Sequence, residues 1–482
     1  MRPIFTLMCA VALTACAGPS VAPGLVVAAE FPDRPTPGEP AAFTPVAPQE
    51  LQLSSGMKVF VLADDSLPLV SLRLMVPTGS ANDPSDKPGL GSLGAAMMSE
   101  AAGERTSLEQ AAALNALAAS AGASLGRERL ILSLDCHADE FDDVLPLVAD
   151  AWLRPAMSKD DWSRVHDQHI NGLKASLDNN GVVARRVAFS TWFGGEHPYG
   201  TPSSGTVSSL QSISLADVQA WHGAQVHAGG ASIVIAGNVD KDTIVETLNA
   251  HFGQWDVSER AVVEVQKASA PTGLFIVDRP GSAQTSIQVL ANGPTASQGD
   301  RVPLDAVRVI MGGSFTSRLN RRLREELGYT YGARMSVHRH LHAGVVQSAA
   351  LVRTDATAHS LQEFTRLWQE AHDTGFSGEE LAKARGQMVT GAVDAAETRA
   401  GLAQLYADEL AAGRSPSAVT EYVASMAKVD KDVISASSTT WLDPKTAMVV
   451  MVGDLKVIGP ELTKSGVTGW TQLSAEGEPV KP

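Results

Sequence analysis

The feature of this sequence that most restricts its fold is an internal duplication. The run VSLRLMVPTGS, which contains Gly79, is similar to TSIQVLANGP, which contains Gly293. The run SIVIAGNVDK, with Gly237, is likewise similar to AMVVMVGDLK, with Gly453. The paired glycines are separated by 214 and 216 residues. Two nearly equal offsets predict two copies of one domain, because independent strands would not repeat at the same distance.

Each copy has the alternation of strands and helices that characterises an α+β domain. Apolar runs such as MKVFVLA and ASIVIAG predict strands, and amphipathic runs at 89–121, 141–153 and 159–175 predict helices. We expect each copy to pack helices on one side of a largely antiparallel sheet. The predicted N-terminal domain covers residues 49–260, and the predicted C-terminal domain covers residues 270–465.

The charge balance argues against one class of partner. The chain has 53 acidic and 38 basic residues, which gives a formal net charge of -15. Nucleic-acid binding requires a basic face for the phosphates, so the sequence predicts no nucleic-acid partner.

The N-terminal residues have the composition of a secretory signal. Arg2 precedes an apolar run that is too short to span a bilayer, and small residues follow it. The run LTAC, ending at Cys16, resembles the bacterial lipoprotein box, which predicts a signal over residues 1–16, a lipid-bearing Cys16 and a tether over residues 17–48. A plain signal peptide cleaved near Ala28 is the alternative. We expect a lipid-anchored protein of the cell envelope, at the periplasmic face of the outer membrane.

The run KPGLGSLGAAMM begins a predicted helix, and its GLxxxxxxM pattern resembles the insulinase/pitrilysin (inverzincin) metallopeptidases of half-length bacterial type. The resemblance implies the LuxS/metallohydrolase-like peptidase fold. Active members carry His-x-x-Glu-His on this helix, where two histidines hold Zn²⁺ and the glutamate is the general base. Alignment places Ser92 and Ala96 at the histidine positions and Ala95 at the glutamate, and residues 164–174 contain no glutamate for a further ligand. The resemblance therefore implies no zinc in this chain.

A second segment, GGSFTSRLNRRLREELGYTYGARMS at 312–336, resembles the part of the family that keeps an Arg-x6-Tyr pair. In the family this pair reaches the zinc site of the opposite half, binds the substrate main chain and stabilises charge at the scissile carbonyl. Arg324 and Tyr331 have this spacing, and Arg322 and Tyr329 are a second pair with the same spacing. The alternative is that these arginines form surface ion pairs with neighbouring glutamates.

The resemblance implies a function that needs a second chain. A half-length subunit without zinc ligands but with the Arg/Tyr motif is similar to the zinc-less subunit of mitochondrial processing peptidase-like proteins. We expect a heterodimer with a zinc-bearing half-length peptidase subunit, with peptides as substrates and zinc on the partner only.

Two other functions remain open from the sequence. One is a pseudo-peptidase that binds peptides or acts as a scaffold, comparable to family members that are structural subunits of respiratory complexes. The other is an enzyme with a separate metal site, since HRHLH would place His338, His340 and His342 on one face of a strand. His166 and His169 also share a helical face, but are predicted to be surface or core residues.

Overall fold

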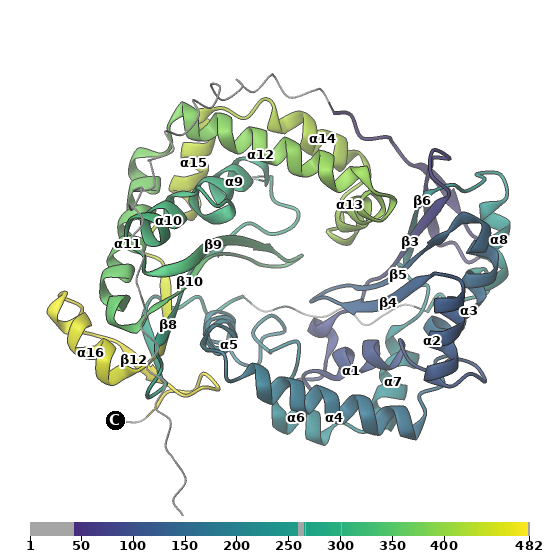
Figure 1. The fold of residues 1–482 in the computed structure, drawn as a ribbon, viewed down its shortest axis with the longest axis horizontal. Helices are drawn as coiled ribbons and strands as arrows, with labels where there is room; N and C mark the ends of the chain where they lie inside the picture. Colours follow the sequence, from purple (N-terminus) through teal and green to yellow (C-terminus); the bar gives the residue numbers. More distant parts are fainter. Residues whose placement is uncertain (1–42, 259–264, 266, 300, 481–482) are drawn as a thin grey trace, which may run out of the picture. The chain divides into compact units, whose positions relative to one another are not determined.

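The computed structural model of the chain describes residues 43–258, 265, 267–299 and 301–480. The predicted signal, Cys16 and most of the predicted tether lie outside the described residues, as does part of the predicted domain boundary. Figure 1 shows two separate sheets with helices packed around them. In the part of the chain that is described, no helix combines the length and apolar character needed to cross a bilayer.

The first sheet has six strands, in the spatial order β1-β2-β6-β3-β5-β4. The strands are β1 (Gln49–Gln52), β2 (Lys58–Ala63), β3 (Leu69–Val76), β4 (Ser120–Leu125), β5 (Leu130–His137) and β6 (Ser232–Gly237). Neighbouring strands are antiparallel except for β2 and β6, which are parallel. The prediction of a largely antiparallel sheet is therefore confirmed.

The second sheet repeats this arrangement, in the order β12-β7-β11-β8-β10-β9. The strands are β7 (Gly273–Asp278), β8 (Gln284–Gly293), β9 (Thr330–Arg339), β10 (Gly344–Arg353), β11 (Met448–Gly453) and β12 (Thr471–Leu473). Strand β7 pairs with β11 in parallel, as β2 pairs with β6. The strands β2-β6-β3-β5-β4 correspond in order to β7-β11-β8-β10-β9, whereas the outer strands differ: β1 precedes β2 and pairs with it antiparallel, and β12 follows β11 and pairs with β7 in parallel. The duplication predicted from the sequence is therefore a duplication of the fold, and the α+β class is confirmed.

The glycines that end β6 and β11 lie where neighbouring atoms leave no room for a side chain. Gly237 has φ +129°, and a Cβ there would lie 2.0 Å from the carbonyl oxygen of Leu69. A Cβ at Gly453 would lie 2.4 Å from Oγ1 of Thr285. Each glycine thus allows the central strand to approach its neighbour, which explains why the sequence repeat includes them.

Each half has its own series of α-helices between and after its strands. The first half contains α1 (Leu90–Met97), α2 (Ser107–Ala116), α3 (Phe141–Leu153), α4 (Lys159–Ser176), α5 (Asn180–Phe193), α6 (Val207–Ser212), α7 (Leu215–Gln225) and α8 (Ile244–Phe252). The second contains α9 (Arg301–Arg308), α10 (Arg318–Asn320), α11 (Thr357–Thr374), α12 (Gly378–Glu397), α13 (Arg399–Ala411), α14 (Ser417–Met426), α15 (Lys431–Trp441) and α16 (Leu455–Lys464). Two π-helical turns, η3 (Val309–Gly313) and η4 (Arg321–Glu326), flank α10, and the short 3₁₀ turns are η1 (Ser80–Asn82), η2 (Ala138–Glu140) and η5 (Thr354–Ala356).

Helices cover both faces of each sheet: the helices of the same half pack on one face, as predicted, and a helix of the opposite half, which the sequence does not predict, packs on the other. Val59 and Val61 of β2 face the main core of the first half, whereas Phe60 and Leu62 face α13, which comes from the second half. Successive strand residues point to opposite faces, so the central strands need apolar side chains at every position. This accounts for the unbroken apolar runs in the sequence.

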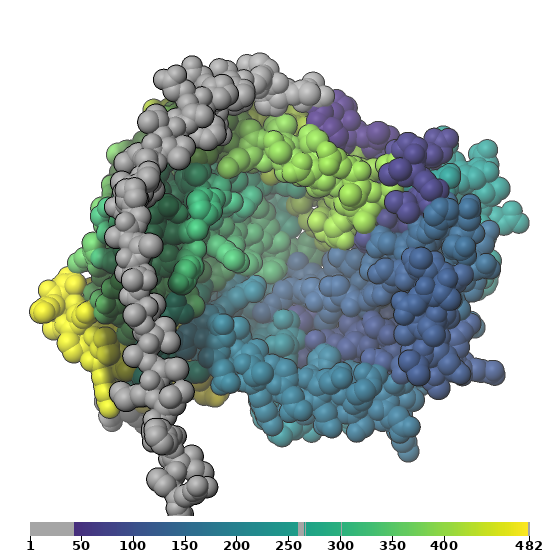
Figure 2. Space-filling model, viewed as in Figure 1, coloured from purple at the N-terminus to yellow at the C-terminus, as the bar shows by residue number. Residues whose placement is uncertain are grey.

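Each half covers one face of the other half's sheet with a helix. Helix α5 of the first half packs Val187 and Phe193 against Val450 and Val452 of the second sheet. Helix α13 of the second half packs Tyr406 against the first sheet, and the Tyr406 hydroxyl donates a hydrogen bond to the Val46 carbonyl (2.6 Å). In Figure 2, atoms of α13 and α14, in yellow-green, adjoin the first strands, in purple. Residues 42–482 consequently form one unit.

Candidate functional site

Helix α1 begins where the sequence predicts the entry of a metal-binding helix. Gly89, with φ +95°, is the residue before its first turn. The Asp83 carboxylate accepts hydrogen bonds from the backbone N–H groups of Gly89 (2.9 Å) and Gly91 (2.8 Å), which have no partner within the helix. Burial raises the pKa of Asp83 to about 7, against the lowering effect of these two bonds. The entry of α1 is therefore held by a buried carboxyl group.

The three positions aligned with the zinc motif lie on α1. Ser92 and Ala96 are half-buried, and Ala95 is buried. Helix α4, which contains the glutamate-free window 164–174, lies against α1. A hydroxyl and two methyl groups do not supply the imidazole and carboxylate donors that zinc requires, so these residues do not fit the metal.

The side of α1 that carries Gly91 and Gly94 is closed by packing. A Cβ at Gly94 would lie 2.2 Å from a ring carbon of Trp221, and a Cβ at Gly91 would lie 2.8 Å from Cδ2 of Leu125. These contacts hold α1 close to α7 and to the end of β4. The helix thus keeps its position in the fold without carrying the zinc-binding side chains.

The histidines of HRHLH do not lie along one strand face, and that prediction is wrong. Strand β9 ends at Arg339, so His340 and His342 belong to the connection between β9 and β10. His338 Nε2 is 2.8 Å from Oε1 of Gln347, and His340 stacks on the Tyr199 ring at 4.5 Å. Burial, together with the nearby His338 and Arg127, lowers the pKa of His340 to about 3. Among the residues described, no group of three or more His, Cys, Asp and Glu side chains is arranged to hold a metal.

His166 and His169 of α4 take part in local contacts. His166 Nε2 lies 2.7 Å from the Leu210 carbonyl oxygen, and its ring stacks on Trp162. His169 Nδ1 lies 3.0 Å from the Val165 carbonyl oxygen, one turn earlier in the helix. Both side chains are therefore accounted for by structural contacts.

The Arg/Tyr segment forms a π-helical turn, a glycine turn and an edge strand. Helix α10 continues into η4, and Gly328, with φ +63°, reverses the chain before β9 begins at Thr330. Strand β9 is the last strand of its sheet, so one of its edges is not paired within the sheet. Helical turns of the π type occur often at functional sites.

The second Arg/Tyr pair is engaged in contacts within the chain. Arg322 forms ion pairs with Glu326 (2.8 Å) and with the buried Glu363 (3.0 Å). The Tyr329 hydroxyl lies 2.9 Å from Nδ1 of His359. The surface ion-pair alternative thus describes Arg322, whose charge is balanced by two carboxylates.

The first pair has fewer polar contacts within the chain. Arg324 stacks on the ring of Phe315 at 3.9 Å and has one longer ion pair, 3.5 Å from Nε to Oε1 of Glu325. Tyr331 is 93% exposed, and Phe315 is 61% exposed. Stacking holds the guanidinium plane while its N–H edge remains open to a ligand.

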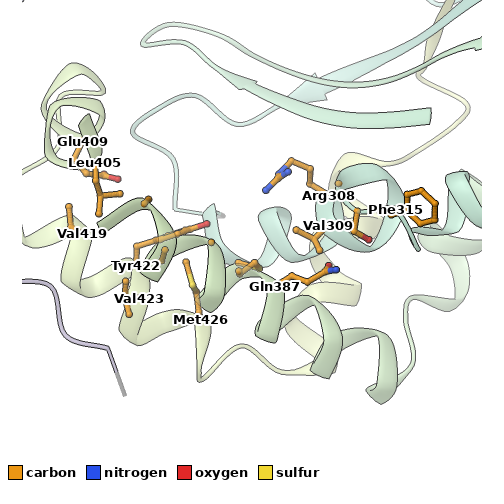
Figure 3. A pocket seen from close by; sticks show the side chains of 16 residues that line it. Arg308, Val309, Phe315, Gln387, Leu405, Glu409, Val419, Tyr422, Val423 and Met426 are labelled. Carbon is orange, nitrogen blue, oxygen red and sulfur yellow. The ribbon is translucent and has the colours of Figure 1, made fainter. Parts of the chain in front are cut away.

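A cavity of about 550 Å³ adjoins this segment through Phe315. Figure 3 shows Arg308 and Val309 on one side of it, and Tyr422, Val423 and Met426 of α14 on the other. Most of the lining side chains are apolar, so the cavity suits a ligand that has an apolar group next to a polar one. The sequence analysis did not identify this cavity, because its walls come from helices distant in the sequence.

The loop at Glu196–Gly200 joins the two halves. The Tyr199 hydroxyl donates a hydrogen bond to the Glu128 carboxylate, and Glu128 also accepts from the backbone N–H of Leu341 (2.9 Å) in the β9–β10 connection. Tyr199 is 1% exposed and packs against His340. This contact could not be found from the sequence, because the partner of the loop lies in the other half of the chain.

Comparison with known proteins identifies one family over most of the described chain. Residues 58–193 match the family model Insulinase (Peptidase family M16), and residues 212–388 match the model Peptidase M16 inactive domain. An uncharacterized zinc protease of Mycobacterium bovis is 23% identical over 364 residues, covering 75% of this chain and 82% of the relative. An uncharacterized zinc protease of Rickettsia felis is 21% identical over 280 residues, covering 58% and 67%.

Solved structures agree in fold. The peptidase M16 inactive domain from Pseudomonas fluorescens has a TM-score of 0.79 at 21% identity, covering 85% of this chain and 98% of that one. A protease from Helicobacter pylori has a TM-score of 0.77 at 16% identity, covering 85% and 99%. A chain of complex III2 from Candida albicans has a TM-score of 0.72 at 14% identity, covering 86% and 99%. By its sequence matches and its duplicated α+β fold, the chain belongs to the insulinase family of peptidases, family M16.

Proposed function

We propose that this chain is the non-catalytic, substrate-binding and transition-state-stabilising subunit of an extracytoplasmic two-subunit zinc metallopeptidase that acts on peptides. One observation carries the proposal: Tyr331 is exposed and Arg324 has a single, longer ion pair, while the zinc-motif positions of α1 hold Ser92, Ala95 and Ala96. The match to the family's inactive-domain model supports the coarser statement that the chain is a non-catalytic peptidase-like subunit.

Arg324 and Tyr331 supply hydrogen-bond donors to the substrate main chain. Cleavage of a peptide bond places negative charge on the carbonyl oxygen in the transition state, and donors fixed beforehand at that point lower the barrier. The cavity beside Phe315 has room for a side chain of the same peptide. These residues bind and orient the peptide, and they do not attack it.

The zinc of the proposed enzyme belongs to a half-length partner subunit. The positions of the zinc motif in this chain do not fit the metal, so a heterodimer is required to complete the site. The general base and the metal ligands lie in the partner in this proposal.

The proposal also places the enzyme at the cell envelope. It rests on the apolar signal and on Cys16 as a lipid-bearing residue, which would hold the complex at the periplasmic face of the outer membrane. Peptides in that compartment are the proposed substrates.

The test is a peptidase assay with an unstructured peptide. The assay compares this chain alone, a zinc-bearing half-length family member from the same cell alone, and the mixture, each with and without a chelator. Activity that appears only in the mixture, and disappears with the chelator, is the expected result. If the zinc-bearing chain alone is as active as the mixture, the proposal is wrong and the chain is a pseudo-peptidase with a binding or scaffold function.

A further inference from the structure

A second cavity, of about 370 Å³, contains an unusual concentration of positive charge. It lies where the end of β4, helix α5, the loop after Gly200 and the end of β9 meet. Three arginines line it, Arg127, Arg185 and Arg186, together with His338 and His340. We call this cavity the arginine pocket. It is distinct from the cavity beside Phe315, with which it shares no lining residue.

The three guanidinium groups have neutral partners. Arg127 donates hydrogen bonds to the carbonyl oxygens of Pro198 (3.3 Å) and Thr201. Arg186 donates to Ser204 Oγ (2.9 Å) and to the Gly205 carbonyl oxygen (2.7 Å). Arg185 lies 5.7 Å from the centre of the Phe189 ring. A guanidinium carries several N–H donors, so these contacts leave donors available in all three residues.

The carboxylates nearest to the pocket have other partners. Asp83 accepts two hydrogen bonds from the entry of α1, and Glu128 accepts from Tyr199 and Leu341. Within the described residues, no ion pair joins a carboxylate to Arg127, Arg185 or Arg186.

The positive charges in the pocket therefore repel one another. Burial, Arg185 and Arg186 lower the pKa of Arg127 to about 10, although Asp83 opposes this effect. Burial also lowers the pKa of Arg186 and of His338. Arg127 and Arg186 are partly buried, and Arg185 is exposed beside them. Uncompensated charges of partly buried groups are costly, and an anion in the pocket would relieve that cost.

We propose that the arginine pocket binds a carboxylate of a peptide, carried by an acidic side chain or by the C-terminus. Leu125, Val182, Phe189 and Pro202 line the same pocket, and this apolar wall suits a carboxylate attached to carbon. Arginine forks bind carboxylates through paired hydrogen bonds. Inorganic phosphate shares the oxyanion chemistry but has no group to occupy the apolar wall.

The position of the pocket connects it with the proposed function. Leu125 ends the edge strand β4 and also contacts α1 at Gly91, one residue before Ser92. A peptide bound along the zinc-less helix could therefore place a carboxylate among the arginines. The inference rests on the proposed function for the arrival of peptides at this site, and it adds a substrate class, peptides with an acidic group.

The experiment is calorimetric titration of the full chain with four probes. The first probe is a short peptide with no charged side chain and a free C-terminus, and the second is the same peptide amidated. The third is the amidated peptide with one internal glutamate, and the fourth is sodium phosphate. We expect at least one of the two carboxylate-bearing peptides, the one with the free C-terminus or the one with glutamate, to bind more tightly than the amidated peptide without glutamate. Arg185→Gln should weaken that binding by about tenfold to a hundredfold, the usual effect of losing a charged hydrogen-bond donor.

Two further variants keep the test decisive. Arg154→Gln removes one positive charge from the exposed end of α3, where Arg154 pairs with Asp150, and should leave binding unchanged. Arg185→Lys keeps the charge but loses the planar guanidinium, so it should bind the carboxylate peptide with an affinity between those of the wild type and Arg185→Gln. Its circular dichroism should equal that of the wild type, which shows that the variant is folded.

Three results would overturn the inference. They are equal affinity for the acid and amide peptides, no effect of Arg185→Gln, and binding of phosphate without binding of either carboxylate peptide. These measurements use the chain alone, so they are separate from the peptidase assay. Carboxylate binding without turnover in the mixture would overturn the proposed function only, whereas turnover without a preference for carboxylates would overturn this inference only.

Discussion

Arg322 and Arg324 are two residues apart in one π-helical turn, but their surroundings differ. Arg322 is held by Glu326 and Glu363, whereas Arg324 lies on the Phe315 ring with one longer contact to Glu325. The sequence spacing allows either arginine to form the Arg/Tyr pair. The difference in partners favours Arg324 as the residue that meets a substrate, and its role remains a prediction.

In the reconstituted two-subunit enzyme, we expect Arg324→Ala or Tyr331→Phe to lower kcat by about 100-fold to 1,000-fold, since each removes a donor to the developing oxyanion. Steady-state kinetics with an unstructured peptide measures the effect.

The matched controls are Arg322→Gln and Tyr329→Phe. Their partners are Glu326, Glu363 and His359, all in this chain, so these variants should alter stability more than kcat. A large fall in kcat in the controls, with none in the Arg324 and Tyr331 variants, would transfer the role to the other pair.

Cys16 can be tested in cells. Cys16→Ser removes the sulfur that would carry the lipid, so we expect the protein to leave the membrane fraction and become extractable without detergent. Fractionation followed by immunoblotting measures the distribution. Retention of Cys16→Ser in the membrane fraction would contradict the predicted lipid anchor.

At the scale of single elements, helix α1 carries Ser92, Ala95 and Ala96 at the positions predicted to correspond to the zinc motif. Its entry is capped by Asp83, and its packing on Trp221 leaves no space for a side chain at Gly94. These features are structural and do not depend on a metal. The zinc-motif positions can therefore be altered to test what else the site lacks.

The triple variant Ser92→His, Ala95→Glu and Ala96→His restores the motif on α1. We expect no zinc-dependent peptidase activity from this variant alone, because α4 has no glutamate in the window where the further ligand is expected. A peptidase assay with added zinc measures it. Cleavage that a chelator abolishes would mean that the rest of the site is intact.

The cap of α1 predicts a pH effect on stability. Burial raises the pKa of Asp83 from an ordinary value near 3.8 to about 7, so the folded state holds this proton more tightly than the unfolded state. The stabilisation is complete below the unfolded pKa and is lost as the pH rises through about 7. Asp83→Asn should remove this dependence.

The measurement is urea unfolding of wild type and Asp83→Asn from pH 4 to pH 8. The free energy of unfolding of the wild type, relative to the variant, should fall as the pH rises across this interval. A difference that stays constant, or one that grows with pH, would show that Asp83 is not protonated in the folded chain near neutrality.

At the scale of the whole molecule, the exchange of α5 and α13 makes each half depend on the other. The second face of each sheet is covered by a helix from the opposite half. We therefore expect the two halves to unfold together in one transition, although each has its own main core.

Leu402→Ala tests this coupling. Leu402 of α13 is 8% exposed and packs on the first sheet, so its truncation should lower the free energy of unfolding by about 2–5 kcal/mol. The control is Leu108→Ala on α2, where the side chain is 79% exposed and a change within about 0.5 kcal/mol is expected.

Denaturant unfolding followed by tryptophan fluorescence and by circular dichroism measures both variants. Coincident curves with a lower midpoint for Leu402→Ala are the expected result. Two separate transitions in the wild type would contradict the coupling of the halves.

The sequence alone determined the duplication and the α+β class, and its resemblance to the family predicts that Ser92, Ala95 and Ala96 stand at the positions of a zinc motif. Strand patterns, paired glycines and side-chain chemistry are local properties, and they can be read without knowledge of distant contacts. The choice between Arg322 and Arg324 was not accessible in this way, because it depends on Glu363 and Phe315.

Only the tertiary structure decided the exchange of α5 and α13, the end of β9 before His340, and the gathering of the three arginines in one pocket. Arg127 comes from the connection between β4 and β5, whereas Arg185 and Arg186 come from α5, more than fifty residues further along the chain. Apolar periodicity predicts that a face is buried, but it does not identify the surface that buries it. That information resides in contacts between residues far apart in the chain, which form only when both halves have folded.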